Sequence, residues 1–264
     1  MRQRLAAALG RRIRVARYHR LQRRLASKQL LRAFAEAHPE AVFVEIGSND
    51  GDQHDHLRPH ILERAWSGIM VEPVPYVFER LRRNYGDLER VQLANVAIAD
   101  EDGTVPFHHL VAPPDDLAAE KLPAWYDAIG SLSRAAVLSH ADRFPDLENR
   151  LVTTDVPSLT YRTLLDRHRV EHVDLLLIDA EGLDWHILES IDLRAGPPRM
   201  LIYEHYHLSR ADRARAGKHL RAHGYETMEE GFDTFCVRTE VDDQLTRTWR
   251  RTRPAVPGAA AYDE

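Results

Sequence analysis

The sequence predicts an α/β fold in which a mostly parallel sheet carries helices on both of its faces. Three short apolar runs alternate with two segments of helical spacing between residues 41 and 99, and this alternation is typical of successive βαβ units. The same alternation returns after residue 158 and ends in two closely spaced apolar runs. The composition suits a packed domain, because 44% of the 264 residues are hydrophobic and 29% are charged.

The chain begins with a basic segment. Residues 1–32 contain eleven Lys and Arg and no Asp or Glu, whereas the other residues together carry a net charge of −16. Apolar residues recur at helical spacing from Leu5 to Phe34, which predicts one or two amphipathic helices. We therefore delimit a basic helical arm over residues 1–38. It packs on the acidic body with its arginines in solvent, or it contacts a membrane surface or RNA.

The first strands follow from apolar runs that end in turn-forming residues. The first run ends at Gly47 and the second at Pro73, and both residue types interrupt a β ladder. Val77, Leu81 and Tyr85 then recur at helical spacing. In chain order the pattern predicts strand 41–46, helix 55–64, strand 68–72, helix 76–85, strand 91–99 and strand 103–110.

An insertion separates the two halves of the predicted sheet. Residues 111–150 are rich in Pro, Asp and Ala and show only patchy periodicity, so we interpret them as a lid or substrate region. The main domain covers residues 39–244, and the basic, then Pro- and Gly-rich residues 245–264 are predicted to form a mobile tail. After the insertion the pattern predicts helix 158–168, strand 173–179, helix 184–191, strand 200–204, helix 209–223 and strands 226–229 and 234–238.

Charge, cysteine content and hydropathy exclude several classes of protein. The net charge of −5 excludes a uniformly basic nucleic-acid-binding protein, and we expect no nucleic-acid partner. Cys236 is the single cysteine, so no disulfide forms within the chain, which fits a reducing cytoplasm. No apolar run approaches the ~18 residues that span a bilayer. The first residues also lack the continuous apolar stretch of a secretory signal, so we expect a cytoplasmic protein without a transmembrane segment.

The strongest local signal is the segment Glu45-Ile46-Gly47-Ser48-Asn49-Asp50-Gly51, which directly follows the first predicted strand. Glycines at this place let the backbone approach a ligand at the carboxyl end of the sheet. The segment lacks the third glycine of a pyrophosphate-binding loop, and its carboxylates would repel phosphates. Carboxylates favour a ligand that carries an ammonium or sulfonium cation, so the segment predicts an adenosyl ligand without phosphates.

Two further strand ends place carboxylates at the same edge of the sheet. Glu72 ends the second predicted strand, where an acidic side chain can accept hydrogen bonds from both hydroxyls of a ribose. Asp179 and Glu181 follow the continuous apolar run of residues 175–178, which is typical of a parallel strand buried on both faces. The sequence therefore predicts one ligand site at the carboxyl ends of the central strands.

The spacing of these motifs resembles the FkbM-type family of S-adenosylmethionine-dependent methyltransferases from about residue 42 to residue 238. The resemblance implies a class I methyltransferase (Rossmann-like) sheet of seven strands, the last one antiparallel, and O-methylation of hydroxyls in natural products, sugars or glycolipids. One departure is Leu177, where family members usually carry a lysine. The motifs are Glu45-x-Gly47-x-Asn49-x-Gly51, Val71-Glu72-Pro73-x-Pro75, Asn95-x-Ala97-Ile98-Ala99-Asp100 with Gly103, Ile178-Asp179-x-Glu181-Gly182-x-Asp184, and Ile202-Tyr203-Glu204-His205.

The resemblance also implies a binding site for S-adenosyl-L-methionine. Residues after the first strand surround the methionine part of this cofactor, Glu72 holds the ribose, and residues of the third strand lie near the adenine. Ser131, in the insertion, is a further candidate that would cover the cofactor. The predicted cofactor-binding residues are Glu45, Gly47, Asn49, Gly51, Glu72, Asn95, Ala97 and Ser131.

Methyl transfer to a hydroxyl needs a group that removes the acceptor's proton, and Asp179, Glu204 and His205 are the predicted catalytic residues. His205 suits a base near neutral pH, because imidazole titrates near ~6.5. In an alternative, Asp179 and Glu204 bind Mg²⁺, which activates the acceptor hydroxyl. Closely spaced histidines, such as His205 and His207, could suggest a zinc site. The sequence places no cysteine and no clustered third ligand near them, so we assign no metal ligand among them.

The sequence thus predicts an S-adenosylmethionine-dependent O-methyltransferase that acts on a hydroxylated small molecule, such as a sugar, a glycoside or another natural product. One alternative is a non-catalytic adenosyl-binding module whose basic arm docks a membrane or an anionic partner. Another is a methyltransferase that acts on RNA or protein, and a third is a dinucleotide oxidoreductase, which would bind NAD. The N-terminal helices also offer a contact for a homo-oligomer.

Overall fold

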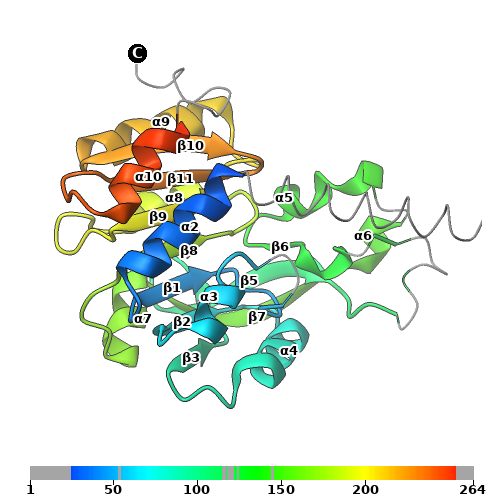
Figure 1. Ribbon diagram of the computed structural model, residues 1–264. Coiled ribbons are helices and arrows are strands. Elements are labelled where there is room, and N and C mark those ends of the chain that lie inside the picture. The colour runs from blue at the N-terminus through cyan, green and yellow to red at the C-terminus, as the bar shows by residue number, and fades with distance from the viewer. Residues whose placement is uncertain are drawn as a thin grey trace, which may run out of the picture.

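A seven-stranded sheet forms the centre of the protein (Figure 1). The computed structural model describes residues 25–253 apart from 53–54, 115–116, 118–121, 124 and 144–145. The strand order is β10-β11-β9-β8-β1-β2-β3; β11 is antiparallel to both neighbours and all other pairs are parallel. The predicted sheet with an antiparallel last strand is confirmed. Its strands are β1 (Val42–Ile46), β2 (Ser67–Val71), β3 (Val91–Ala94), β8 (Leu175–Ile178), β9 (Met200–Glu204), β10 (Tyr225–Glu230) and β11 (Asp233–Arg238).

Side chains alternate along the central strands and form two hydrophobic cores, one on each face of the sheet. In β1, for example, Phe43 belongs to one core and Val44 to the other. Helices cover both faces, as the sequence predicted, and α2 crosses in front of the sheet in Figure 1. The first core takes in α2 (Ala26–Ala37), α3 (Arg58–Glu63), α4 (Pro75–Tyr85) and α10 (Gln244–Thr252), and the second α7 (Tyr161–His168), α8 (Asp184–Ser190) and α9 (Arg210–Ala222).

The helices α2 and α10 pack against each other on one face of the sheet. Phe34 of α2 and Trp249 of α10 are both completely buried there. The mobile tail predicted from residue 245 is therefore wrong for residues 245–252, which belong to the first core. Residues 1–24 of the predicted basic arm and residues 254–264 of the predicted tail lie outside the described residues.

Both helices begin at a carboxylate that accepts hydrogen bonds from free backbone N–H groups. The N–H groups of Ala26 and Ser27 donate to Glu230 at 2.9 and 2.8 Å, and the N–H of Thr246 donates to Asp243 at 2.8 Å. A carboxylate at a helix N-terminus also interacts favourably with the helix dipole. The contacts with Glu230 of β10 fix α2 to the sheet, and the contact with Asp243 caps α10.

A second, four-stranded sheet lies beside the first in the order β4-β7-β5-β6. It contains β4 (Ala97–Ile98), β5 (Gly103–Leu110), β6 (Gly130–Ser131) and β7 (Leu151–Leu159). The predicted strand 91–99 is thus divided, because the chain leaves the main sheet after β3 and β4 joins the second sheet. The helix predicted from residue 158 begins at Tyr161, because β7 continues to Leu159, pairing with β5 from Leu151 to Ser158 and with β4 at its end.

The inserted residues have a small hydrophobic core of their own. Tyr126, Ile129, Val137 and Leu147 pack together under β5. The segment contains the 3-10 helices η1 (Tyr126–Ala128) and η2 (Ala141–Arg143) and the helices α5 (Arg134–Leu138) and α6 (Leu147–Arg150). In Figure 1 the inserted segment, with α5, β6 and α6, extends beyond the carboxyl ends of the parallel strands of the main sheet. None of the helices in the described part of the chain is long and apolar enough to cross a membrane.

Candidate active site

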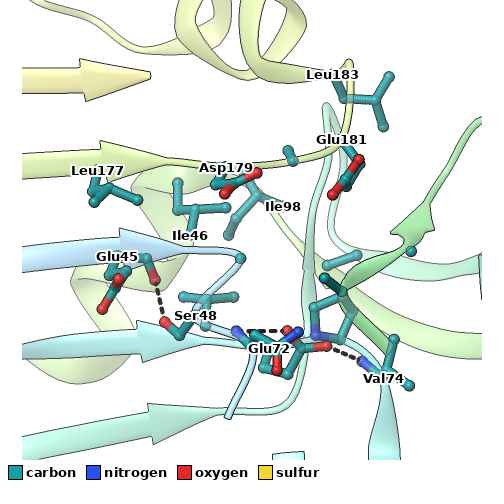
Figure 2. Close-up of a pocket in the computed structure, with 18 of the residues that line it drawn as sticks. Glu45, Ile46, Ser48, Glu72, Val74, Ile98, Leu177, Asp179, Glu181 and Leu183 are labelled. Carbon is teal, nitrogen blue, oxygen red and sulfur yellow. Dashed lines mark hydrogen bonds between the residues drawn. The ribbon is translucent and has the colours of Figure 1, made fainter. Parts of the chain in front are cut away.

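A cavity lies at the carboxyl ends of β1, β2 and β8 and reaches residues of the second sheet and the insertion. Figure 2 shows Glu72, which follows β2, and Asp179 and Glu181, which follow β8, around the same space. The loops after parallel strands meet at one edge of a sheet, which explains why residues far apart in the sequence converge here. Of the predicted cofactor-binding residues, Glu45, Gly47, Asn49, Glu72 and Ala97 line the cavity.

Gly47 lets the loops after β1 and β8 approach each other. Its φ is +83°, and a Cβ atom added there would lie 1.8 Å from the carbonyl oxygen of Asp179. The Asp179 N–H donates to the carbonyl of Ile46 at 2.8 Å, and the N–H groups of Gly47 and Ser48 donate to the carbonyl of Val71 at 3.0 Å. Only glycine fits this position without displacing the neighbouring loop.

Glu72 holds two loops of the cavity in place. One carboxylate oxygen accepts a hydrogen bond from the Val74 N–H at 2.7 Å, and the other accepts from the Asn49 N–H at 3.1 Å (Figure 2). Burial raises the pKa of Glu72 to about 7, although these two N–H donors act against the shift. Each oxygen keeps a second lone pair, so the carboxylate can accept further hydrogen bonds from a ligand.

Two asparagines connect the cavity loops to their surroundings. Asn49 donates from Nδ2 to the carbonyl of Asp127 in the insertion at 3.2 Å, and Asp127 forms an ion pair with Arg80 of α4. Asn95 donates from Nδ2 to the carbonyls of Glu72 and Pro73, at 2.8 and 3.1 Å. Asn95 is not among the described residues that line the cavity; it supports the loop that carries Glu72.

Glu45 places a buried acceptor in the cavity. Glu45 is 3% exposed, and its Oε2 accepts no hydrogen bond from an N–H donor of the described residues; the polar side chain beside it is another carboxylate, Asp55. Burial, and then the nearby Asp55, raise the pKa of Glu45 well above its usual value. A buried acceptor without a partner is costly, and a ligand that donates a hydrogen bond or carries a positive charge removes that cost.

Asp179, Glu181, Asp184 and Glu204 form an acidic cluster at the ends of β8 and β9. Burial raises the pKa of Asp184 to about 8, and burial followed by Asp179 raises that of Glu204 to about 10. Burial followed by Glu181 raises the pKa of Asp179 well above its usual value. Like charges in a buried cluster disfavour one another's ionisation, so the cluster gains stability from a cation. Asp179 and Glu204, the residues predicted to hold Mg²⁺, both belong to it, and a Mg²⁺ ion there stays a prediction.

His205, the predicted base, faces away from the cavity. Its Nδ1 lies 2.9 Å from the hydroxyl of Thr234, and its Nε2 lies 3.7 Å from a carboxylate oxygen of Glu229. The ring is buried, which lowers the pKa of His205. Neither His205 nor Glu204 is among the described residues that line the cavity, whereas Asp179 is.

Gly51 and Ser131, two other predicted cofactor-binding residues, are not among the described residues that line the cavity, and they support its loops. A Cβ atom at Gly51 would lie 2.4 Å from the ring of Tyr85, so this glycine permits close packing of the loop on α4. Ser131 donates from Oγ to the carbonyl of Glu181 at 3.3 Å. That bond joins the second sheet to the loop after β8.

The sequence predictions gave no binding or catalytic role to three residues near the cavity. Glu181 lines the cavity, and its Oε2 lies 3.2 Å from Nε2 of His207 and 3.7 Å from Nε2 of His140. Glu181 stands in the Asp-x-Glu-Gly motif and His207 was one of the paired histidines, so both carried a signal. His140 carried none, because it comes from the insertion and lies 67 residues from His207 in the sequence.

Comparisons with known sequences match this chain to methyltransferases. Residues 45–227 match the family model described as the methyltransferase FkbM domain. Over 70 residues the chain is 39% identical to the 2-O-methyltransferase NoeI of Sinorhizobium fredii (strain NBRC 101917 / NGR234), and that match covers 26% of this chain and 28% of NoeI.

Solved structures of methyltransferases are also similar. A methyltransferase FkbM from Methylobacillus flagellatus KT is 12% identical with a TM-score of 0.47, over 75% of this chain and 44% of that one. A methyltransferase from Geobacter sulfurreducens is 13% identical with a TM-score of 0.40, over 84% of this chain and 87% of that one. The matches thus span less than half the length of NoeI and of the Methylobacillus protein.

Proposed function

The chain belongs to the FkbM methyltransferase family, and on this basis we propose that it is an S-adenosylmethionine-dependent O-methyltransferase that acts on a small molecule. The proposed acceptor is a hydroxyl of a sugar, a glycoside or another natural product. The observation that carries the proposal is the acidic lining of the cavity, to which Glu45, Glu72 and Asp179 contribute carboxylates. Carboxylates attract a sulfonium or ammonium cation and repel a pyrophosphate.

The residues of the cavity fit this cofactor. Glu72 can accept hydrogen bonds from the ribose hydroxyls with its remaining lone pairs while it holds the loops. Glu45 offers a buried carboxylate, with Asp55 beside it, to a cationic group. Gly47 has no side chain, so the loop after β8 can lie directly against it and close this side of the cavity. The cofactor, when bound, supplies a methyl carbon made electrophilic by its positively charged sulfur.

The protein's own task is to align the acceptor and to take its proton. The acceptor oxygen forms a bond to the methyl carbon as the carbon–sulfur bond breaks, and the hydroxyl proton passes to a base. Of the predicted catalytic residues, Asp179 lines the cavity, and it is our first candidate for that base. Its pKa is raised by burial, and a cation in the cavity favours its ionised form.

The rim of the cavity supports an acceptor with a ring. Trp125 lines the cavity. Outside the lining, the exposed rings of Tyr206 and Phe232 lie 4.5 Å apart, and Tyr206 lies 4.8 Å from the ring of His207, which contacts the lining residue Glu181. Aromatic faces offer a large apolar contact area at small cost in conformational entropy. The short match to a protein named as a 2-O-methyltransferase favours oxygen as the accepting atom.

Binding and turnover test the proposal separately. Calorimetry on the full chain should give binding of S-adenosylmethionine and S-adenosylhomocysteine and none of NAD. Isotope-labelled methyl groups should then reach one of a panel of hydroxylated sugars and glycosides, as read by mass spectrometry. Binding of NAD in place of the adenosyl compounds would overturn the proposal, and binding of those compounds without transfer to any alcohol would favour a non-catalytic adenosyl-binding module.

A further inference from the structure

Three side chains from separate parts of the fold converge at the rim of the cavity. His140 follows α5, Glu181 follows β8 and His207 follows β9. One ligand atom of each, a ring nitrogen or a carboxylate oxygen, lies within 4.8 Å of the other two. The side chains are largely enclosed, with exposed fractions of 11%, 18% and 17% respectively.

We propose that His140, Glu181 and His207 bind a divalent first-row transition-metal ion such as Zn²⁺. Two imidazoles and one carboxylate form a ligand set that suits such ions, whereas Mg²⁺ and Ca²⁺ prefer oxygen ligands only. The site therefore differs in chemistry from the Mg²⁺ pair predicted at Asp179 and Glu204. It goes beyond the proposed function, because binding of the ion requires neither cofactor nor acceptor.

The distances suit a common metal ion. Ligands about 2.0–2.1 Å from a tetrahedral ion lie roughly 3.3 Å from one another, and opposite ligands of an octahedral ion lie roughly 4.2 Å apart. Nε2 of His207 lies 3.2 Å from Oε2 of Glu181, and Nε2 of His140 lies 3.7 Å from the same oxygen. Small rotations of the two rings are enough to close the remaining gap.

The charge around Glu181 also favours a bound cation. Its Oε2 is inaccessible to solvent and accepts no hydrogen bond from the described residues. Asp179, Asp184 and Glu204 lie in the same cluster, and no Lys or Arg of the described chain forms an ion pair with any of the four carboxylates. A divalent ion at Glu181 would offset the repulsion that this arrangement creates.

The position of the site leaves part of the ion's coordination free. Three side chains fill three of the four to six positions that such an ion takes. Glu181 also lines the cavity, so an ion bound to it lies at the cavity's rim, beside Trp125, whose ring centre is 5.9 Å from that of His140. The free positions are available to water or to an oxygen of a bound small molecule.

Cobalt provides a direct test, because Co²⁺ absorbs visible light when nitrogen and oxygen ligands surround it. The untagged full chain, freed of metal with a chelator, is titrated with Co²⁺ and then with Zn²⁺. We expect one Co²⁺ to bind per chain, with absorption bands that Zn²⁺ abolishes by displacement. His140→Gln and His207→Gln should each weaken binding at least tenfold, and Glu181→Gln should weaken it similarly.

A matched control uses a second histidine pair of the described chain whose rings are in contact. His219 lies in α9 and His223 directly follows that helix, and their ring centres are 4.5 Å apart. Neither belongs to the group of His140, Glu181 and His207. The double variant His219→Gln/His223→Gln should bind Co²⁺ as the unaltered protein does. Circular dichroism checks that each variant is folded. Absence of a Co²⁺ spectrum in the unaltered protein would overturn the proposal, and so would binding that survives in a folded His140→Gln or His207→Gln variant.

Discussion

Replacing Gly47 with alanine tests the contact that closes the cavity. The added methyl carbon would lie 1.8 Å from the carbonyl oxygen of Asp179. Carbon and oxygen approach to about 3.3 Å in weak contacts, so the loops after β1 and β8 must separate by about 1.5 Å. This separation would strain the hydrogen bond from the Asp179 N–H to Ile46 and shift the carboxylate that we propose as the base.

The expected cost has two parts. Forcing a residue with a Cβ atom into the left-handed region costs about 1–2 kcal/mol, and overpacking against a neighbouring backbone costs about 1–3 kcal/mol more. We therefore expect Gly47→Ala to lower the free energy of unfolding by about 2–5 kcal/mol. Binding of S-adenosylhomocysteine should weaken as well, because both loops line its proposed site.

Substitutions at two other glycines distinguish the cost of backbone strain from the cost of the steric contact. Gly231 has a φ of +70° and nothing within 4 Å of an added Cβ, so Gly231→Ala should show the backbone strain alone. Gly196 is open and needs no left-handed conformation, so Gly196→Ala should change little. Urea unfolding of all three variants measures the difference. The reasoning fails if Gly47→Ala is no less stable than Gly231→Ala, because the steric contact would then have no effect.

Three further predictions follow from the same structure. Glu72→Ala should weaken binding of S-adenosylhomocysteine by about 1–3 kcal/mol, roughly 5- to 150-fold, through loss of hydrogen bonds; equal affinity in calorimetry would remove Glu72 from the ribose. Trp249→Ala should lower the unfolding free energy by about 3–5 kcal/mol, because the indole is completely buried and donates to Glu226 at 2.7 Å; an unchanged urea midpoint would mean that α10 contributes nothing. The pKa of Glu72 is raised from 4.5 to about 7, so the folded state binds the proton more tightly than the unfolded state. The free protein should therefore lose stability as the pH rises from 4.5 to about 7, by up to about 3 kcal/mol from this residue, and the loss should be smaller in Glu72→Gln; a flat profile would contradict the buried position of this carboxylate.

Residues at the ends of predicted strands could be located from the sequence, because a parallel sheet gathers its strand ends at one edge. Glu72 and Asp179 illustrate this, since each follows an apolar run and each lines the cavity. His205 shows the limit of that reasoning. A strand end fixes where the backbone lies, but the direction of the side chain depended on Thr234 of β11, with which its ring forms a hydrogen bond.

Features that depend on distant partners could not be predicted from local patterns. The helix α10 was mistaken for a tail because its sequence is polar and basic, and Leu245 and Trp249 become informative only when they meet α2. His140 meets Glu181 and His207 only because the insertion folds over the ends of β8 and β9. The paired histidines thus had a third partner that no spacing in the sequence reveals.

The account depends most on where the adenosyl ligand binds, and a crystal structure of the complex with S-adenosylhomocysteine tests this directly. We expect the ribose hydroxyls within hydrogen-bond distance of the Glu72 carboxylate, with the sulfur between the carboxyl end of β1, which carries Glu45, and the loop that carries Asp179. A ligand bound elsewhere, or a cavity that stays empty at saturating concentration, would contradict the assignment of this cavity as the methyl-transfer site.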